Sequence, residues 1–272
     1  MNLFEYYEQD SFLHRLNPTI KLAAIFVLLF AVVLAFDPAT PLVFLMLAIA
    51  LLAGLGRISI LLILRTLIPF WIVAIGFVLT NAFLYNTSQV QTPTVLAQWG
   101  PAWITMEGVR AGLSLGLRAL AIVSYSMLFV MTTDPTYFIL SLIQQLRLNY
   151  RFGYGVLVSY RFLPMLRAEY DTIRAAHHVR GVGERTGLRD RYEQFKRYAI
   201  PLLASAIRKS ERVALAMDSK AFGVAAHRTY YRTLTVRRSD WLFLLALIAA
   251  TALILVTLAK AGLLRGYGLV PA

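Results

Sequence analysis

The chain has 272 residues, of which 58% are hydrophobic and 15% charged, whereas a soluble domain usually carries about 25% charged residues. The apolar residues are clustered in long runs, so membrane insertion explains them better than one large soluble core. The sequence contains no cysteine, which excludes disulfides and thiolate metal sites.

Five apolar runs are candidates for membrane-spanning helices, since such a helix needs about 20 mostly apolar residues. They cover residues 20–36, 42–55, 60–84, 106–131 and 241–258. Residues 37–41 form a turn, because two prolines and an aspartate cannot continue a helix. Residues 86–103, rich in Thr, Gln, Pro and Asn, are expected to form a loop. The stretch before Arg15 is acidic, unlike a cleaved signal peptide, so we expect the first helix to be retained.

The polar segment between the fourth and fifth runs is also predicted to be helical. We expect helices over residues 136–146, 152–179 and 195–222, and a polar connector over residues 185–194. Gly181 and Gly223 stand where the two long helices end, and glycine readily adopts the left-handed conformation that closes a helix. We therefore predict an all-α integral membrane protein with about five transmembrane helices plus amphipathic helices outside the bilayer. The expected parts are residues 1–131 (transmembrane helices), 132–238 (cytoplasmic helices) and 239–272 (a last transmembrane helix).

Positive charge is concentrated in one part of the chain. Between Arg147 and Arg238 there are 19 Lys and Arg and 7 Asp and Glu, so this stretch carries +12 of the net charge of +13. Residues 86–103 contain neither Lys nor Arg. Because basic residues are enriched on the cytoplasmic side, we expect the basic stretch and the N-terminus to be cytoplasmic and the loop and the C-terminus to be outside. Nucleic-acid binding explains the charge less well, because the aromatic residues here fall at helical core spacing.

One string resembles an enzyme motif. Residues 112–116 read Gly-Leu-Ser-Leu-Gly, which fits the G-x-S-x-G pattern of a nucleophile elbow. That motif requires a strand–turn–helix setting and a nearby base, whereas this string lies within a predicted span and the four histidines lie outside the spans. We therefore interpret Gly108, Gly112 and Gly116 as a small-residue stripe for close helix packing and assign no catalytic residue.

The same predicted helix carries Glu107, Arg110, Ser114 and Arg118 at steps of three and four, so these residues share one face. Arg118 lies well inside the span, where a charge is costly and usually faces the protein interior or a cavity. Two interpretations remain open. Either Arg110 pairs with Glu107 while Arg118 snorkels toward the membrane surface or caps a buried carbonyl, or the stripe contacts a partner membrane protein.

The sequence predicts neither a metal site nor a nucleotide site. His177 and His178 are adjacent, so on a helix they point about 100° apart and cannot share a metal ion. The chain contains no G-x-x-x-x-G-K-[ST] string, the usual phosphate-binding loop. If the protein takes part in ATP-driven work, a separate subunit must bind the ATP, and we expect this chain to bind no cofactor.

Several strings occur in an order that is informative. They are residues 10–22 (DSFLHRLNPTIKL), 132–135 (TTDP), 160–169 (YRFLPMLRAE), 175–181 (AAHHVRG) and 214–223 (ALAMDSKAFG). Their order and spacing resemble the transmembrane T component of energy-coupling factor (ECF) transporters, the EcfT/CbiQ family. The resemblance covers about residues 10–260, and the last two strings fall where that family carries its paired Ala-Arg-Gly motifs.

Both motifs depart from the family pattern. The first, Val179-Arg180-Gly181, has Val in place of Ala. The second, Ser219-Lys220-Ala221, has Lys in place of Arg and Ala in place of Gly. Lysine keeps the charge but lacks the planar guanidinium fork, so the second contact is expected to be weaker or differently shaped. The alternative to a partner contact is that both basic residues only cap their helices, because a positive charge in the last helical turn interacts favourably with the helix dipole, by about 0.3–1 kcal/mol.

The resemblance implies a non-catalytic coupling subunit of an importer in a bacterial or archaeal cell membrane. In that family two ABC ATPases bind ATP in the cytoplasm, and a membrane-embedded S component binds a vitamin, a vitamin precursor or a transition-metal ion. Arg180 would contact one ATPase and Lys220 the other, and the stripe from Gly108 to Arg118 would be a candidate contact for the S component. The alternative is a membrane-embedded enzyme acting on a lipid-like substrate at the cytoplasmic face, although the acidic residues of the basic segment show no catalytic spacing.

Overall fold

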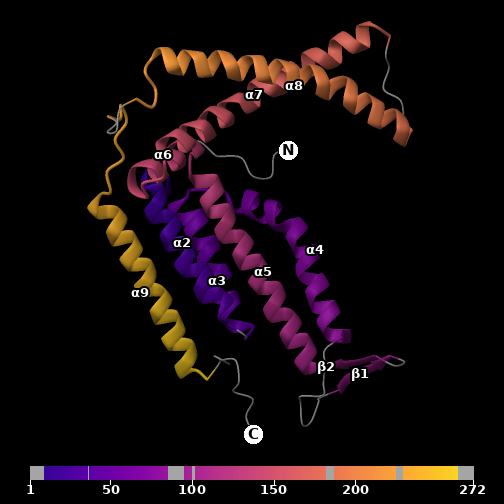
Figure 1. Ribbon diagram of the computed structural model, residues 1–272. Coiled ribbons are helices and arrows are strands. Elements are labelled where there is room, and N and C mark those ends of the chain that lie inside the picture. The colour runs from indigo at the N-terminus through magenta and orange to yellow at the C-terminus, as the bar shows by residue number, and fades with distance from the viewer. Residues whose placement is uncertain are drawn as a thin grey trace. The chain divides into compact units, whose positions relative to one another are not determined.

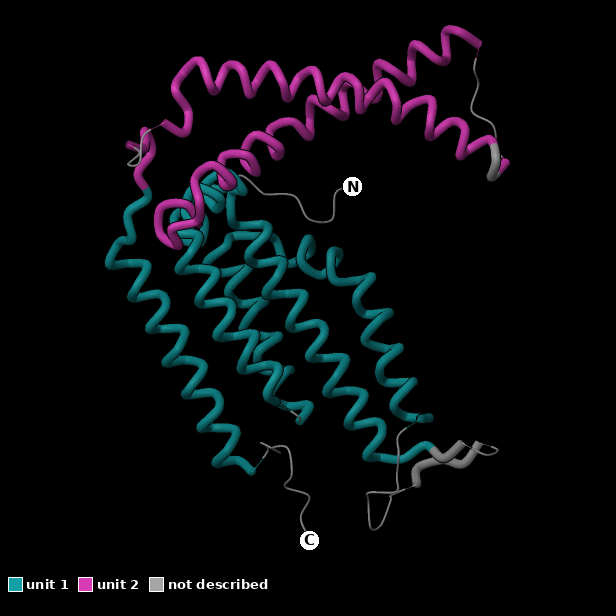
Figure 2. The backbone as a smooth tube through the Cα atoms, viewed as in Figure 1, with its two compact units in different colours: residues 1–141, 234–272 teal, residues 142–233 magenta. Residues whose placement is uncertain are grey.

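The computed structural model divides the chain into two compact units. It describes residues 9–35, 37–84, 95–99, 102–181, 187–224 and 229–262. Unit 1 comprises residues 1–141 and 234–272, and unit 2 comprises residues 142–233 (Figure 2). The segment predicted as cytoplasmic, residues 132–238, extends beyond unit 2 at both ends, because its first and last residues pack with the apolar helices.

Unit 1 contains the apolar helices. They are α2 (Pro18–Val33), α3 (Ala39–Ala50, extended by a π-helical turn, Leu51–Leu55), α4 (Ile60–Leu84), α5 (Met106–Thr132) and α9 (Arg238–Lys260). Helices α4, α5 and α9 are long and apolar enough to cross a membrane, and α2 and α3 are shorter apolar helices. The predicted all-α membrane class is therefore confirmed, with three long helices and two shorter ones at the five apolar runs.

The core of unit 1 lies among α2, α3 and α5, whose inner faces supply most of its buried side chains. Helix α9 packs on α2, and α4 packs on α5 at the other side (Figure 1). The outer faces of these two helices are apolar and exposed, as at Leu61 (76% exposed), Ile72 (71%) and Leu242 (66%). Contiguous apolar surface of this extent marks a binding or membrane surface, and on helices of this length it is expected to face lipid.

The predicted loop over residues 86–103 contains regular structure. Strands β1 (Val95–Trp99) and β2 (Ala102–Thr105) pair as an antiparallel hairpin, with Gln98 opposite Trp103. The predicted loop therefore contains a hairpin that was not expected from the sequence, and its aromatic and β-branched residues favour such extended pairing. The rest of the predicted loop, up to residue 94, lies outside the described residues.

Unit 2 is built on two long helices, α7 (Tyr150–Val179) and α8 (Leu188–Ser219). The prediction of a polar connector over residues 185–194 is wrong from Leu188 onward. Charged side chains in this stretch contact neighbours on the same helix. Lys196 Nζ lies 3.6 Å from a carboxylate oxygen of Glu193 and 4.3 Å from the centre of the Tyr192 ring. Contacts at three- and four-residue spacing stabilise a helix, which explains why a strongly charged sequence is helical here.

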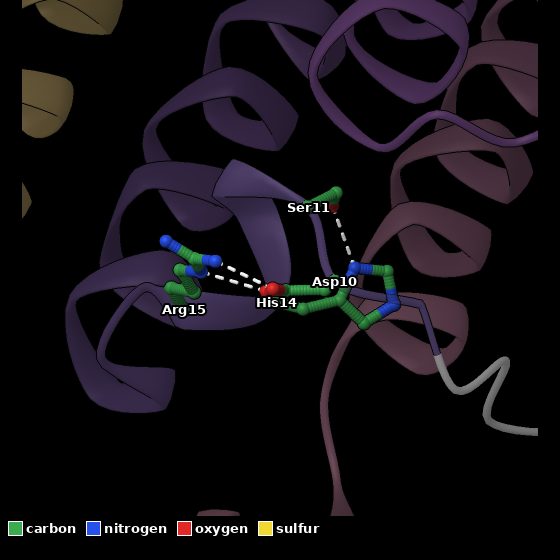
Figure 3. A network of polar contacts seen from close by, with 4 residues as sticks. All are labelled: Asp10, Ser11, His14 and Arg15. Carbon is green, nitrogen blue, oxygen red and sulfur yellow. Dashed lines mark hydrogen bonds and ion pairs between the residues drawn. The ribbon is translucent and has the colours of Figure 1, made fainter.

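Two short helices complete the described structure. Helix α1 (Phe12–Arg15) precedes α2, and α6 (Pro135–Gln145) follows α5. The turn at α1 is closed by side chains: the Arg15 guanidinium donates to both carboxylate oxygens of Asp10, at 2.6 and 2.5 Å, and Ser11 Oγ lies 2.6 Å from His14 Nδ1 (Figure 3). The hydrogen bonds from Arg15 hold the pKa of Asp10 below its usual value.

Candidate coupling site

The two helices of unit 2 are joined by a polar contact near the middle of each. Glu169 on α7 accepts hydrogen bonds from Ser205 Oγ (2.8 Å) and Lys209 Nζ (2.6 Å), both on α8. These hydrogen bonds lower the pKa of the Glu169 carboxyl, and the one from Lys209 has the larger effect. Helices α7 and α8 cross in Figure 1, and this contact joins them.

Aromatic side chains extend the same contact toward the end of α7. Tyr198 on α8 is buried, with its ring centre 5.7 Å from that of Tyr170 in an edge-to-face arrangement. The same ring lies 5.5 Å from the imidazole of His177. Edge-to-face aromatic pairs contribute about 0.5–1.5 kcal/mol beyond the area that they bury. Polar and aromatic contacts together therefore fix α7 and α8 as a pair.

The C-terminal end of α7 presents its basic residue to solvent. Val179 is 88% exposed and Arg180 is also exposed. Gly181 has φ +74°, and its N–H donates to the His178 carbonyl at 3.0 Å. A Cβ at Gly181 would meet nothing within 4 Å. The left-handed glycine thus ends the helix as predicted, with Arg180 exposed directly before it.

The end of α8 has a similar geometry with different residues. Lys220 is exposed, and the next residue, Ala221, has φ +54°, followed by Gly223 at φ +93°. Alanine in the left-handed region costs about 1 kcal/mol relative to glycine. The Phe222 N–H donates to the Met217 carbonyl at 3.0 Å and so completes the turn. The predicted helix end at residue 222 is therefore three residues too late, because this turn is a cap and not helix.

The end of α8 is anchored onto the first turns of α7. The Phe222 ring packs edge-to-face against Tyr150 and Tyr154, each at 5.8 Å between ring centres. Arg151 Nη2 donates to the Gly223 carbonyl at 2.7 Å. The backbone after Lys220 is thus fixed by both aromatic and polar contacts, which compensates for its less favourable conformation.

A pocket of about 490 Å³ adjoins this anchored end. Its lining includes Tyr154, Met217, Lys220 and Phe222, so a cation lies at the edge of an aromatic and apolar hollow. Such a combination suits a partner side chain that is apolar along its length and carries an acceptor at its tip.

The glycine stripe on α5 packs within the chain itself. A Cβ on Gly112 would lie 2.7 Å from the Cα of Val78, and one on Gly116 would lie 2.9 Å from the Ala74 carbonyl oxygen. Gly108 is buried on the same helix. These approaches bring α5 and α4 together, and Arg110 on the stripe is exposed. A contact of the stripe with an S component stays a prediction.

Two polar side chains of α5 hold the chain between α2 and α3. Arg118 Nη2 donates to the Ala35 carbonyl, and Ser114 Oγ donates to the Asp37 carbonyl at 3.1 Å. Arg118 thus binds a backbone carbonyl, as one interpretation of this residue expects, and a contact of the stripe with a partner stays a prediction. Ser114 is buried in the middle of a helix, without the strand–turn–helix setting of a nucleophile elbow.

Comparison with known proteins assigns the family. The family model described as CbiQ, cobalt transport protein, matches residues 9–231 and so covers both helix ends described above. The chain belongs to this family. Energy-coupling factor transporter transmembrane proteins EcfT are similar over nearly the whole length. That of Brevibacillus brevis is 32% identical over 93% of this chain and 94% of its own, and that of Limosilactobacillus fermentum is 30% identical over 91% and 93%.

The protein is therefore the transmembrane T component of an ECF transporter and a non-catalytic subunit of it. The alternative prediction of a membrane-embedded enzyme is not favoured. A putative ABC transporter ATP-binding protein of Bifidobacterium longum is also similar: 25% identity covers 90% of this chain but 32% of that longer protein. Because this relative is named as an ATP-binding protein, its similarity supports the predicted association of this T component with ATPases.

Several residues that hold the candidate site in place were not predicted from the sequence. Glu169 contacts residues 36 and 40 positions further along, and Arg151 contacts a carbonyl 72 positions away. No local pattern reveals such partners. Phe222 stands in the string ALAMDSKAFG, but nothing in that string indicates that its ring packs on α7.

Proposed function

We propose that Arg180 and Lys220 are the contacts through which two ABC ATPase subunits act on this T component. The observation that carries the proposal is that α7 and α8 are joined at a crossing while each presents a cation at a left-handed turn beyond its last residue. A guanidinium or ammonium group seated in a partly desolvated groove makes charge-assisted hydrogen bonds, which are roughly twice as strong as neutral ones.

The crossing gives the proposed contact a mechanical consequence. Because Glu169 and Tyr198 connect the two helices, approach of the ATPases during ATP binding would displace α7 and α8 together and not bend either one alone. The helix pair would then act on a membrane-embedded S component, which holds the substrate. The ATP itself is bound by the partner ATPases.

The composition of the complex tests this proposal. We expect the tagged chain, purified from its native membrane in mild detergent, to bring down two ATPase subunits and one small membrane protein for each copy. Mass spectrometry of the intact complex measures this stoichiometry. A chain that is recovered alone, from membranes in which the ATPases are present, would count against the proposal.

The substrate is proposed to be a vitamin, a vitamin precursor or a transition-metal ion. The matching family is described by cobalt transport, so cobalt is the first candidate to measure. Since the S component would bind the substrate, the identity of the co-purified small membrane protein decides among these classes, and uptake of each candidate by the purified, reconstituted complex checks the assignment.

The orientation in the membrane is also proposed: unit 2 and the N-terminus in the cytoplasm, and the hairpin of β1 and β2 outside. Its basis is the +12 charge between Arg147 and Arg238. Because the chain has no cysteine, Gln98→Cys and Ser210→Cys each give a single thiol. An impermeant maleimide applied to intact cells should label the first and not the second, and the reverse pattern would refute the orientation.

A further inference from the structure

The N-terminal segment binds unit 1 a few residues from each of the two points at which the chain passes between the units. The chain leaves unit 1 after Ser141 and returns to it at Leu234. The first of these points lies inside α6, which directly follows α5, and the second precedes α9. Residues 12–21, from α1 into α2, bind the end of α5 and the start of α9.

Lys21 binds the end of α5. Its side chain is only 1% exposed, and Nζ donates three hydrogen bonds: to the Thr132 carbonyl (2.9 Å), to Thr132 Oγ1 (3.1 Å) and to Thr133 Oγ1 (3.1 Å). The three donors of the ammonium group are thus all used. They satisfy a carbonyl at the C-terminal end of α5, where a positive charge is favoured by the helix dipole. Directly after this point, Asp134 accepts from the Thr136 N–H at 2.6 Å and begins α6.

Asp240 binds the same segment to the start of α9. This carboxylate is 2% exposed; one oxygen accepts from the Arg237 N–H (2.7 Å) and the other from the Asn17 N–H (3.3 Å). One turn earlier in the N-terminal segment, the Phe12 ring packs edge-to-face on Phe243, with 5.9 Å between ring centres. A polar contact and an aromatic contact therefore hold α9 to residues four and nine positions before Lys21.

A plain helix cap accounts poorly for Lys21. An ammonium group buried among neutral oxygens loses its hydration, and the favourable interaction of a helix cap offsets only a small part of that cost. Its partners lie 111 and 112 residues away, so the gain comes from joining distant elements and not from ending a local helix.

We propose that residues 12–21 form a clasp, with Lys21 and Asp240 as positioning residues, that fixes the α5–α6 junction and the start of α9 to one body. Displacement of unit 2 would then reach the membrane helices through two fixed junctions and would not be lost by bending there. This inference rests on the proposed coupling function.

Spin labels measure the clasp independently of activity. Tyr137→Cys on α6 and Leu242→Cys on α9 place two labels at exposed positions of the cysteine-free chain, in the full complex. We expect one narrow distance distribution in the otherwise unchanged chain and in Lys260→Met, which removes an exposed lysine elsewhere on α9. In Lys21→Met the distribution should broaden, and substrate uptake per ATP hydrolysed should fall at least 10-fold, with the subunits still assembled. Lys21→Arg should recover part of both.

If Lys21→Met fails to accumulate, Thr133→Val removes one of the three acceptors, keeps the lysine, and should give a smaller broadening and a smaller loss. An unchanged distribution, or a broadened one with unchanged uptake per ATP, would overturn the clasp. A failure of the proposed coupling function can be told apart from a failure of the clasp. If the coupling function is wrong, Arg180→Ala leaves uptake unchanged, whereas the label distances still show whether residues 12–21 fix α6 and α9.

Discussion

Arg180→Ala is expected to weaken ATPase binding or to uncouple ATP hydrolysis from transport, while unit 1 stays folded. Removing one partner of a buried, hydrogen-bonded charge contact costs about 2–5 kcal/mol. Since 1.4 kcal/mol is a factor of ten, the affinity for the ATPase should fall by roughly 30-fold or more. Subunit stoichiometry and substrate-stimulated ATP hydrolysis of the purified complex measure the effect.

The matching change at the other helix end provides the comparison. Lys220→Ala should act in the same direction but less strongly, because the ammonium lacks the planar fork of the guanidinium, and Lys220→Arg should be tolerated. The double variant should be worse than either single one. Plain capping predicts a loss of at most about 1 kcal/mol of local helix stability with assembly intact, so unchanged stoichiometry and coupling in both alanine variants would leave these residues as caps.

Gly112→Leu is expected to prevent α5 and α4 from packing. The new Cβ would lie 2.7 Å from the Cα of Val78 and 2.9 Å from the carbonyl oxygen of Phe77, and both are backbone atoms that no rotamer change can move. Overpacking of a tight interface commonly costs about 1–3 kcal/mol, and backbone displacement adds to this. The amount of folded protein in the membrane and its melting temperature in detergent should both fall sharply.

Gly76→Leu is the matched control, since it places the same side chain on an exposed position of α4 where a Cβ meets nothing within 4 Å. It should accumulate normally. Ser114→Ala removes one hydrogen bond and should leave transport nearly unchanged. Normal accumulation of Gly112→Leu would contradict the packing, and complete loss of activity in an assembled Ser114→Ala complex would revive an enzymatic role.

Most of the membrane part could be predicted because its signals are local. The apolar run over residues 106–131 differs from α5 by one residue, and Thr105, whose hydroxyl accepts from the Gly108 N–H at 3.3 Å, is an N-cap of a common type. The glycines that end the helices of unit 2 could likewise be predicted from the sequence. In the structure Gly181 and Gly223 both have positive φ, as a helix-ending glycine does. The start of α8 was missed because its charges look like a connector until their partners along the helix are known.

What could not be predicted depends on distant pairs. The sequence places Lys21 at the start of an apolar run, where a lysine ordinarily reaches toward water. The structure buries it against Thr132 and Thr133. The partner of Glu169 could not be chosen either, because basic residues are spread through the whole of unit 2. These pairings are set by how helices pack, and no spacing along the chain encodes that.

Photo-cross-linking at the two helix ends tests the central claim most directly. A benzoylphenylalanine at Val179 or at Ser219 lies one residue before each cation and leaves Arg180 and Lys220 in place. Tyr192, exposed near the start of α8, is the control position. In the purified complex, irradiation should join residues 179 and 219 to the ATPase subunits and leave position 192 unlinked to them. Complexes that contain both ATPases but form no such cross-link from either helix end would contradict the account.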